Sequence, residues 1–212
     1  MKTPLVILSV SLFWCQYSVA QQAPRDPNYL LDETPWSLML YRGWTSTKNL
    51  NESLRFQYES AHEDMYAAEL AYTLAPTNPI SQFLWYIRSR FQLAGNVAYR
   101  RDKEANNDIL ELDLYFMLRW RNFPWNRFLA TTFAIGEGIS WASQVPSVEK
   151  IDDDNDSRKL LNYLMFEATF ALPSHPDLQL VYRLNHRSGA YGLFDNSDFG
   201  SNVLGFGLRY HF

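Results

Sequence analysis

The stretch ILELDLYFMLRW (residues 109–120) has the two-residue period of a β-strand. Its even positions are large apolar residues, from Leu110 to Trp120, whereas its odd positions include Glu111 and Asp113. Successive side chains of a strand point to opposite faces of the sheet, so the pattern predicts one apolar and one polar face. An amphipathic helix would instead repeat its apolar residues with a period of about 3.6. The stretch therefore predicts a strand that separates an apolar environment from a polar one.

Seven further segments of similar length show the same alternation. The eight expected strands are 36–45, 64–75, 82–93, 109–120, 127–137, 159–172, 177–188 and 202–212. Short, turn-rich segments follow the second, fourth and sixth strands, and longer polar segments follow the first, third, fifth and seventh. This arrangement is typical of bacterial outer-membrane proteins. We therefore predict an all-β fold, an eight-stranded antiparallel transmembrane β-barrel of the outer membrane, with both termini in the periplasm.

The polar faces of these strands carry charges of both signs and would line the interior of the barrel. They contribute Glu69, Arg88, Arg90, Glu111, Asp113, Glu167, Arg183 and Arg209. An eight-stranded barrel is too narrow for an open channel, and side chains fill it. Because unpaired buried charges are costly, we expect these residues to pair with one another. The charges are therefore predicted to be structural, and the size argues against a porin.

The first twenty residues have the features of a secretory signal peptide. Lys2 supplies the positive charge, an apolar run over 5–14 follows, and the segment SVA (18–20) matches a cleavage site. The apolar run is about half as long as a membrane-spanning helix. We therefore expect residues 1–20 to be a signal peptide. Residues 21–35, which contain three prolines, are expected to be a periplasmic lead-in, and 36–212 the barrel.

Cysteine and charge content fit the same environment. Cys15 is the only cysteine, so a chain processed after residue 20 contains none, as is typical of many bacterial envelope proteins. A lipoprotein signal built on Cys15 is disfavoured because Trp14 occupies the position where such signals have a small residue. Removing residues 1–20 removes Lys2 and no acid, so the formal net charge changes from −4 to −5. Without a basic patch, nucleic acid is not an expected partner.

The chain ends in GLRYHF (207–212), in which bulky apolar residues alternate with Gly207, Arg209 and His211. The aromatic last residue, Phe212, makes this segment resemble the C-terminal strand of outer-membrane barrels, which the barrel-insertion machinery recognises. We therefore expect that machinery to be a partner through Phe212.

The stretch LNHRSGAYGLF (184–194) places His186 and Ser188 two residues apart on the seventh strand. By parity they share the apolar face with Tyr182 and Leu184, so we expect them on the lipid side, at the external end of the strand. A serine becomes a nucleophile only with an adjacent base, and that base needs a third group to orient it. Polar residues also commonly mark the membrane interface without catalysis, so both interpretations stay open.

An exported eight-stranded barrel with H-x-S on its penultimate strand resembles the lipid A 3-O-deacylase (PagL-type) family, also described as acyloxyacyl hydrolases. The likeness spans essentially the whole chain after the signal peptide. Its motifs are YRLNHRSGAYGLF and GSNVLGFGLRYHF, with weaker matches in HEDMYAAELAY and AIGEGISWAS. The resemblance implies an outer-membrane serine esterase that removes an ester-linked acyl chain from lipid A of lipopolysaccharide. It implies Ser188 as nucleophile, His186 as base, lipopolysaccharide of the outer leaflet as partner, and neither cofactor nor metal.

Two positions depart from the family pattern. The family motif often continues H-x-S-N-A, whereas Gly189 and Ala190 follow Ser188 here, so their backbone N–H groups are the candidate oxyanion donors. The family's acidic residue is a Glu near the start of the eighth strand, and DNSDFGSN (195–202) contains none. The candidates for the third member are Asp195, Asp198 and Asn202, with Glu137 as a more remote one.

Several alternatives remain. A catalytically inactive barrel with a structural, adhesion or lipid-binding role is the main one, because a fold does not fix a function. A periplasmic β-protein is disfavoured by the eight apolar stripes and by Phe212. The acidic segment KIDDDND (150–156) is expected to be a solvated external loop rather than a cation site. The sequence predicts no oligomeric state.

Overall fold

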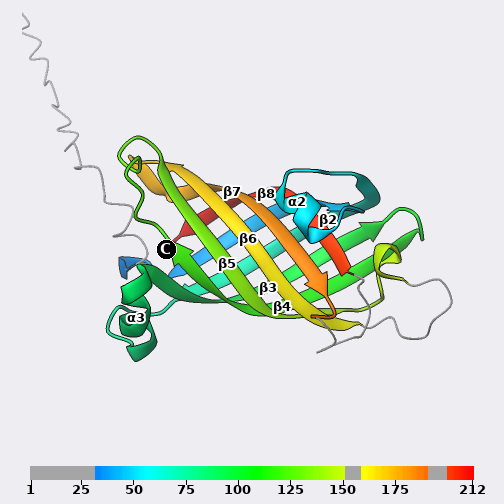
Figure 1. Ribbon diagram of the computed structural model, residues 1–212, viewed down its shortest axis with the longest axis horizontal. Coiled ribbons are helices and arrows are strands. Elements are labelled where there is room, and N and C mark those ends of the chain that lie inside the picture. Colours follow the sequence, from blue (N-terminus) through cyan, green and yellow to red (C-terminus); the bar gives the residue numbers. More distant parts are fainter. Residues whose placement is uncertain (1–31, 151–158, 191–199) are drawn as a thin grey trace, which may run out of the picture.

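The computed structural model of the protein describes residues 32–150, 159–190 and 200–212. The strands are β1 (Trp36–Ser46), β2 (Ser60–Thr73), β3 (Ser89–Asp102), β4 (Asn107–Trp120), β5 (Ala130–Ala142), β6 (Leu160–Leu172), β7 (His175–Ser188) and β8 (Gly200–His211). The helical segments are α2 (Leu50–Leu54), α3 (Pro79–Leu84), η1 (Trp85–Ile87) and η2 (Ser147–Glu149). Consecutive strands pair antiparallel and β1 pairs with β8, which closes the barrel (Figure 1). The predicted fold class is therefore confirmed. In the described part of the chain, no helix is long and apolar enough to cross a membrane.

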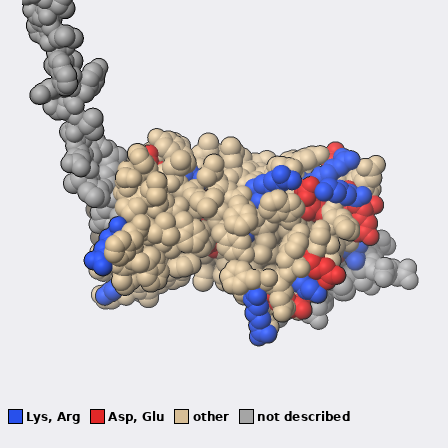
Figure 2. All heavy atoms as spheres, turned by 90° about the horizontal axis from the view of Figure 1, so that it is seen from above, with Lys and Arg blue, Asp and Glu red and all other residues tan. Residues whose placement is uncertain are grey.

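The outer surface of the barrel is apolar over its middle. Outward side chains such as Leu40 on β1 and Leu114 on β4 are 62% and 65% exposed. Figure 2 shows a broad band with few charged side chains between two ends where charges gather. Apolar surface of this extent is stable against lipid rather than water. The parity predicted for β4, β6, β7 and β8 is confirmed, since their predicted outward residues face out.

The interior is filled by two groups of ionised side chains. The first group, which we call the Glu167 network, contains Glu69, Tyr115, Arg119, Glu167, Arg183 and Arg209. The Arg119 guanidinium lies 2.6 Å from a Glu167 oxygen, and Arg183 and Arg209 bind the same carboxylate from β7 and β8. Arg209 also lies 2.9 Å from Glu69. Every member is almost completely buried, so the charges are compensated by one another rather than by water.

The second group, the Arg100 network, lies toward the Ser188 end of the strands. It contains Glu63, Arg100, Glu111, Glu149, Arg187 and Ser201. Arg100 binds Glu63 at 2.6 Å and Glu111 at 2.8 Å, while Arg187 binds Glu149 at 2.7 Å. Glu149 belongs to η2 in the β5–β6 connection, so this loop reaches into the mouth of the barrel. Of the predicted lumen charges, four pair with one another: Glu69, Glu167, Arg183 and Arg209. Glu111 and Arg90 pair instead with Arg100 and Asp32, which were not predicted, and no ion pair with a described residue is formed by Arg88 or Asp113.

Asp113 and Arg88 depart from that expectation in different ways. Asp113 is buried but is held by a hydrogen bond from Asn96 at 2.7 Å rather than by an arginine. Arg88 is exposed and has a positive φ of 55°, because it ends η1 instead of belonging to a strand. The prediction that Arg88 lines the lumen was wrong.

The third predicted strand, 82–93, was also misplaced, because a helix occupies its first half. Asn78 caps α3 by accepting a hydrogen bond from the Ile80 N–H at 3.0 Å, and Pro79 occupies the first turn. Asn at the N-cap followed by Pro is a strong helix start. The actual strand, β3, covers 89–102, and small outward residues such as Gly95 weaken its apolar stripe.

This shift changes the connections. The segment after β2 now covers 74–88 and includes α3 and η1, whereas the segment after β3 covers only 103–106. The predicted alternation of short and long connections therefore holds only in part. The start and the end of the barrel nevertheless meet. The Trp36 N–H donates to the Phe212 carbonyl at 3.3 Å, and the Phe212 N–H donates to the Trp36 carbonyl at 3.0 Å. The start of β1 and the end of β8 thus lie together at one end of the barrel, beside α3 (Figure 1). Recognition of Phe212 by the insertion machinery stays a prediction, and the predicted signal peptide (1–20) lies outside the described residues.

Replacing Glu167 by Gln is expected to destabilise the barrel strongly. The substitution leaves three buried arginines around an uncharged amide, and breaking such a buried pair costs about 3–5 kcal/mol of unfolding free energy. Urea unfolding in detergent micelles measures this loss. The matched control, Glu59→Gln, removes an exposed carboxylate bound to Lys48, and we expect it to leave the unfolding midpoint unchanged. Equal midpoints for Glu167→Gln and wild type would contradict the structural role of the network.

Candidate functional site

A group of polar side chains interrupts the apolar outer face near one end of β5 to β8. Strand register places Glu137, Leu164, His186 and Asn202 side by side on four adjacent strands. The neighbouring row contains Ile139, Asn162, Ser188 and Gly200. Both His186 and Ser188 are half-buried on the outward face, as their parity predicted. The site is therefore built on strands rather than on a loop, and it faces the lipid side.

His186 is held by Asn202 on the adjacent strand. His186 Nδ1 lies 2.9 Å from Asn202 Oδ1, and the Asn202 Nδ2 group donates to the Lys48 carbonyl at 2.7 Å. The second bond fixes the amide, because a flipped amide would put its oxygen against a carbonyl oxygen. Asn202 Oδ1 can only accept, so the proton of a neutral His186 is on Nδ1. Nε2 is then unprotonated and can act as a base, which is the arrangement of Cys-His-Asn sites.

The segment that holds Asn202 is the β1–β2 connection, residues 47–59. Ser46 Oγ accepts bonds from the backbone N–H groups of Lys48 and Glu59, both at 3.2 Å, which closes the base of this loop. The Lys48 ammonium lies 2.8 Å from the Glu59 carboxylate, and this hydrogen bond lowers the pKa of Glu59. A capping box between Asn49 and Glu52 starts α2. The Lys48 carbonyl thus sits on a locally ordered loop.

Ser188 is the last residue of β7 and has room on its β8 side. A Cβ atom added to Gly200, its partner, would lie 2.0 Å from the Arg187 carbonyl oxygen, so only glycine fits there. Two residues along a strand are separated by about 7 Å between Cα atoms, so His186 and Ser188 are neighbours on one face. Among the described residues, no hydrogen bond joins their side chains. Catalytic hydrogen bonds are often long before substrate binds.

Asn162 is a member of this group that the sequence interpretation missed. It faces outward on β6, opposite Ser188, and donates from Nδ2 to the Glu137 carboxylate and to the Gly138 carbonyl at 3.3 Å. The alternation of β6 already placed position 162 on the apolar face, so a polar residue there was the available signal. Glu137 contacts Asn162 and lies two strands from His186.

The remaining candidates are placed as follows. Asn202 contacts His186, whereas Asp195 and Asp198 lie outside the described residues, as does most of the acidic segment 150–156. Gly189 and Ala190 directly follow Ser188, and Ala190 has a positive φ of 49°. The structure thus brings Asn202 to the histidine and brings Glu137 only to Asn162.

The inward side of the same strands is rigidly held. Arg187, between His186 and Ser188, points into the lumen and binds Glu149 and the Lys159 carbonyl, the latter at 3.1 Å. Ser201, next to Asn202, donates to Glu149 at 2.5 Å. Side chains of the Arg100 network therefore fix both strands that carry the site.

A groove of about 530 Å³ runs along the outer surface from below His186. Its apolar walls are Leu54, Phe56, Ile135, Phe166, Phe170 and Leu184. Phe56, which follows α2 and has a φ of 60°, stacks on Tyr182 with a ring separation of 6.3 Å. Leu184 lies one outward step from His186, about 7 Å along the strand. The groove, which we call the α2 groove, thus begins beside the polar group and can hold an extended apolar chain.

Comparisons with solved structures support the fold. The outer-membrane enzyme PagL aligns over 82% of this chain and 98% of its own, with 13% identity and a TM-score of 0.50. The N-terminal β-barrel domain of Pseudomonas aeruginosa OprF aligns over 84% and 98%, with 12% identity and a TM-score of 0.48. Neisserial surface protein A aligns over 84% and 95%, with 12% identity and a TM-score of 0.45. No protein-family model and no curated protein sequence matches the chain. The likeness to PagL supports the fold of a bacterial outer-membrane barrel, and at this identity it shows the fold alone.

The tautomer of His186 can be tested directly. In micelles, ¹⁵N–¹H correlation spectra of histidine-labelled protein are expected to show His186 protonated at Nδ1. Asn202→Leu removes the acceptor while keeping a similar volume, so the Nδ1–H preference should be lost, with the exposed His175 as unchanged control. An Nε2-protonated His186 in the wild type would contradict the assigned hydrogen bond.

Proposed function

We propose that the protein is an outer-membrane serine esterase that removes an ester-linked acyl chain from lipid A of lipopolysaccharide. The observation that carries this proposal is the His186–Asn202 pair, placed beside Ser188 on the outer face and directly above an apolar groove. A substrate that is itself a membrane lipid reaches such a site from the bilayer. A water-soluble substrate would not, because the surrounding surface is apolar.

The chemistry is acyl transfer. Ser188 Oγ attacks the ester carbonyl carbon while His186 Nε2 takes the hydroxyl proton and later gives it to the departing sugar oxygen. A water molecule, activated by the same nitrogen, then cleaves the acyl–serine ester. Asn202 keeps His186 in the required tautomer throughout. The backbone N–H groups of Gly189 and Ala190 are the proposed donors to the oxyanion. No step needs a metal or a cofactor.

The acyl chain and the sugar of the substrate are assigned to different surroundings of Ser188. The α2 groove accepts the acyl chain, because its lining is almost wholly apolar. Glu137 on β5 and Asn162 on β6 lie on the same strands as the groove but nearer their Ser188 end, and they offer hydrogen-bond acceptors that suit the hydroxyl and amide groups of a glucosamine unit. Lipopolysaccharide occupies the outer leaflet, so this assignment places the Ser188 end of β7 outside and both termini in the periplasm.

Ser188→Ala and His186→Ala are each expected to reduce lipid A deacylation by roughly 10⁴-fold or more, because each removes a group that forms or activates the nucleophile. Mass spectrometry of lipid A from cells that express each variant measures the reaction. Ser174→Ala and His175→Ala, at the opposite end of β7, are matched controls and should act like wild type.

Unchanged lipid A with well-inserted wild-type protein would overturn the esterase proposal. The protein would then be a non-enzymatic barrel, the alternative that the departures from the family motif leave open. Activity that survives Ser188→Ala would instead show that another residue is the nucleophile.

The α2 groove gives a second prediction. Ala168→Phe places a ring on the groove floor, so hydrolysis of long-chain esters should fall about tenfold or more relative to short-chain esters. Ala68→Phe, the same change on the outward face of β2, is the control. The ratio of kcat/KM for the two chain lengths is the measurement, and an unchanged ratio would rule out the groove as the acyl site.

A further inference from the structure

At the end of the barrel opposite Ser188, the β2–β3 connection forms an exposed aromatic segment, residues 79–88, which we call the aromatic arm. It consists of α3, η1 and Arg88. Phe83, Trp85 and Tyr86 are 74%, 64% and 87% exposed. Large aromatic side chains exposed together on a short helical segment indicate a surface that is covered in the working protein.

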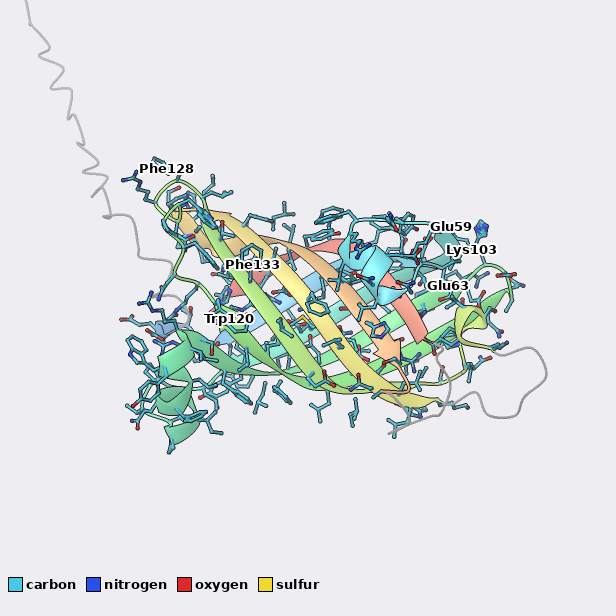
Figure 3. The ribbon with its side chains drawn as sticks, in the orientation of Figure 1. Glu59, Glu63, Lys103, Trp120, Phe128 and Phe133 are labelled. Carbon is cyan, nitrogen blue, oxygen red and sulfur yellow. The ribbon has the colours of Figure 1, made fainter. Side chains whose placement is uncertain are left out.

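The aromatic arm continues the lipid-facing surface of the barrel. The Trp120 indole N–H, at the end of β4, donates to the Ile87 carbonyl at 3.0 Å and ties the arm to the outer wall. The β4–β5 connection adds Phe123, which packs edge-on against Phe133 of β5 with 5.2 Å between ring centroids. In Figure 3, Trp120 and Phe128 lie toward this end, whereas Glu59, Glu63 and Lys103 lie at the other. Aromatic residues are enriched at this depth of membrane proteins.

A cavity of about 520 Å³ opens between the arm and the barrel wall. Trp85, Tyr86, Arg88, Arg90, Arg121 and Asn122 line it, together with Ser89. Arg90 and Arg121 both bind Asp32, at 3.1 and 3.3 Å. Arg88 forms no ion pair with any described residue, and the buried Nε of Arg90 lacks a hydrogen-bond partner among them. The described lining of the cavity thus contains three arginines and no acidic residue, and Arg88 and the Arg90 Nε group can donate to a ligand.

We propose that the aromatic arm lies in the headgroup region of the adjacent leaflet and that this cavity binds the phosphate of a glycerophospholipid. Charge complementarity and continuity with the lipid-facing wall both favour this occupant. Arginine donates paired N–H groups to phosphate oxygens, and Trp85, whose ring lies 5.5 Å from the Arg90 guanidinium carbon, can pack against the glycerol esters. This site is independent of Ser188 and of any hydrolysis.

The position of the arm can be tested with a single fluorescent probe. In a Cys15→Ser background, the full chain carries no other cysteine, so Tyr86→Cys can be labelled with an environment-sensitive dye. In vesicles of phosphatidylethanolamine and phosphatidylglycerol with brominated chains, we expect strong quenching of this probe and protection from iodide. Lys103→Cys, in the charged turn at the other end, should be quenched several-fold less. A Tyr86 probe that iodide reaches freely would overturn the placement and favour a surface left open for another partner.

The phosphate site needs its own measurement. Native mass spectrometry of the detergent-solubilised protein, titrated with phosphatidylglycerol, should show about tenfold weaker binding for Arg88→Gln than for wild type. Arg55→Gln makes the same charge change on the exposed end of α2 and should bind like wild type. Diacylglycerol with identical chains has no phosphate, so comparing its affinity with that of phosphatidylglycerol separates phosphate recognition from chain binding. Equal affinity of Arg88→Gln and wild type, or equal affinity for the two lipids, would overturn the phosphate assignment.

Discussion

Ionised side chains packed together in the buried interior are the constraint on which this barrel depends. Eight strands leave an interior just wide enough for side chains, and the Glu167 carboxylate, on β6, there binds arginines from β4, β7 and β8. A slip of one residue in any of these strands would turn a charge toward lipid and a leucine or phenylalanine toward the lumen. The ion pairs are therefore weak evidence for added stability but strong determinants of register, since a shifted register would take these arginines away from the Glu167 carboxylate.

The same interior also fixes the positions of the side chains in the outer site. Inward and outward side chains alternate, so Arg187 and Ser201, held by Glu149, bracket the outward His186, Ser188 and Asn202. The β1–β2 connection completes the arrangement from outside through the Lys48 carbonyl. Catalytic groups on strands can be held more closely than groups on loops. The barrel thus combines a rigid polar group with an apolar groove whose second wall, the segment around Phe56, comes from a different strand connection.

Much of the fold could be predicted from the sequence, because the alternation of apolar and polar residues along a strand is a local property. The outward placement of His186 and Ser188 followed from the parity of β7 alone. The third strand was misplaced because Asn78 and Pro79 start a helix whose residues Phe83, Trp85 and Ile87 happen to alternate as a strand would. The contact between His186 and Asn202, and the place of Asn162 beside Ser188, depend on register across strand pairs. Register is set by long-range packing in the lumen, so the sequence left Asn202 as one of several possibilities. It marked Asn162 only as a polar residue on an apolar face and could not place it beside Ser188.

The position of Glu149 in the mouth of the barrel limits evolutionary change in the β5–β6 connection. Its carboxylate contacts Arg187, Ser201 and, at 3.6 Å, Arg100, so η2 is a structural part of the lumen although it belongs to a surface connection. Surface loops usually tolerate substitution, insertion and deletion well. Here that tolerance ends at η2: lengthening the β5–β6 connection before Glu149 would pull a buried charge away from its partners. Variation among related chains should therefore accumulate after Glu149 and be sparse before it.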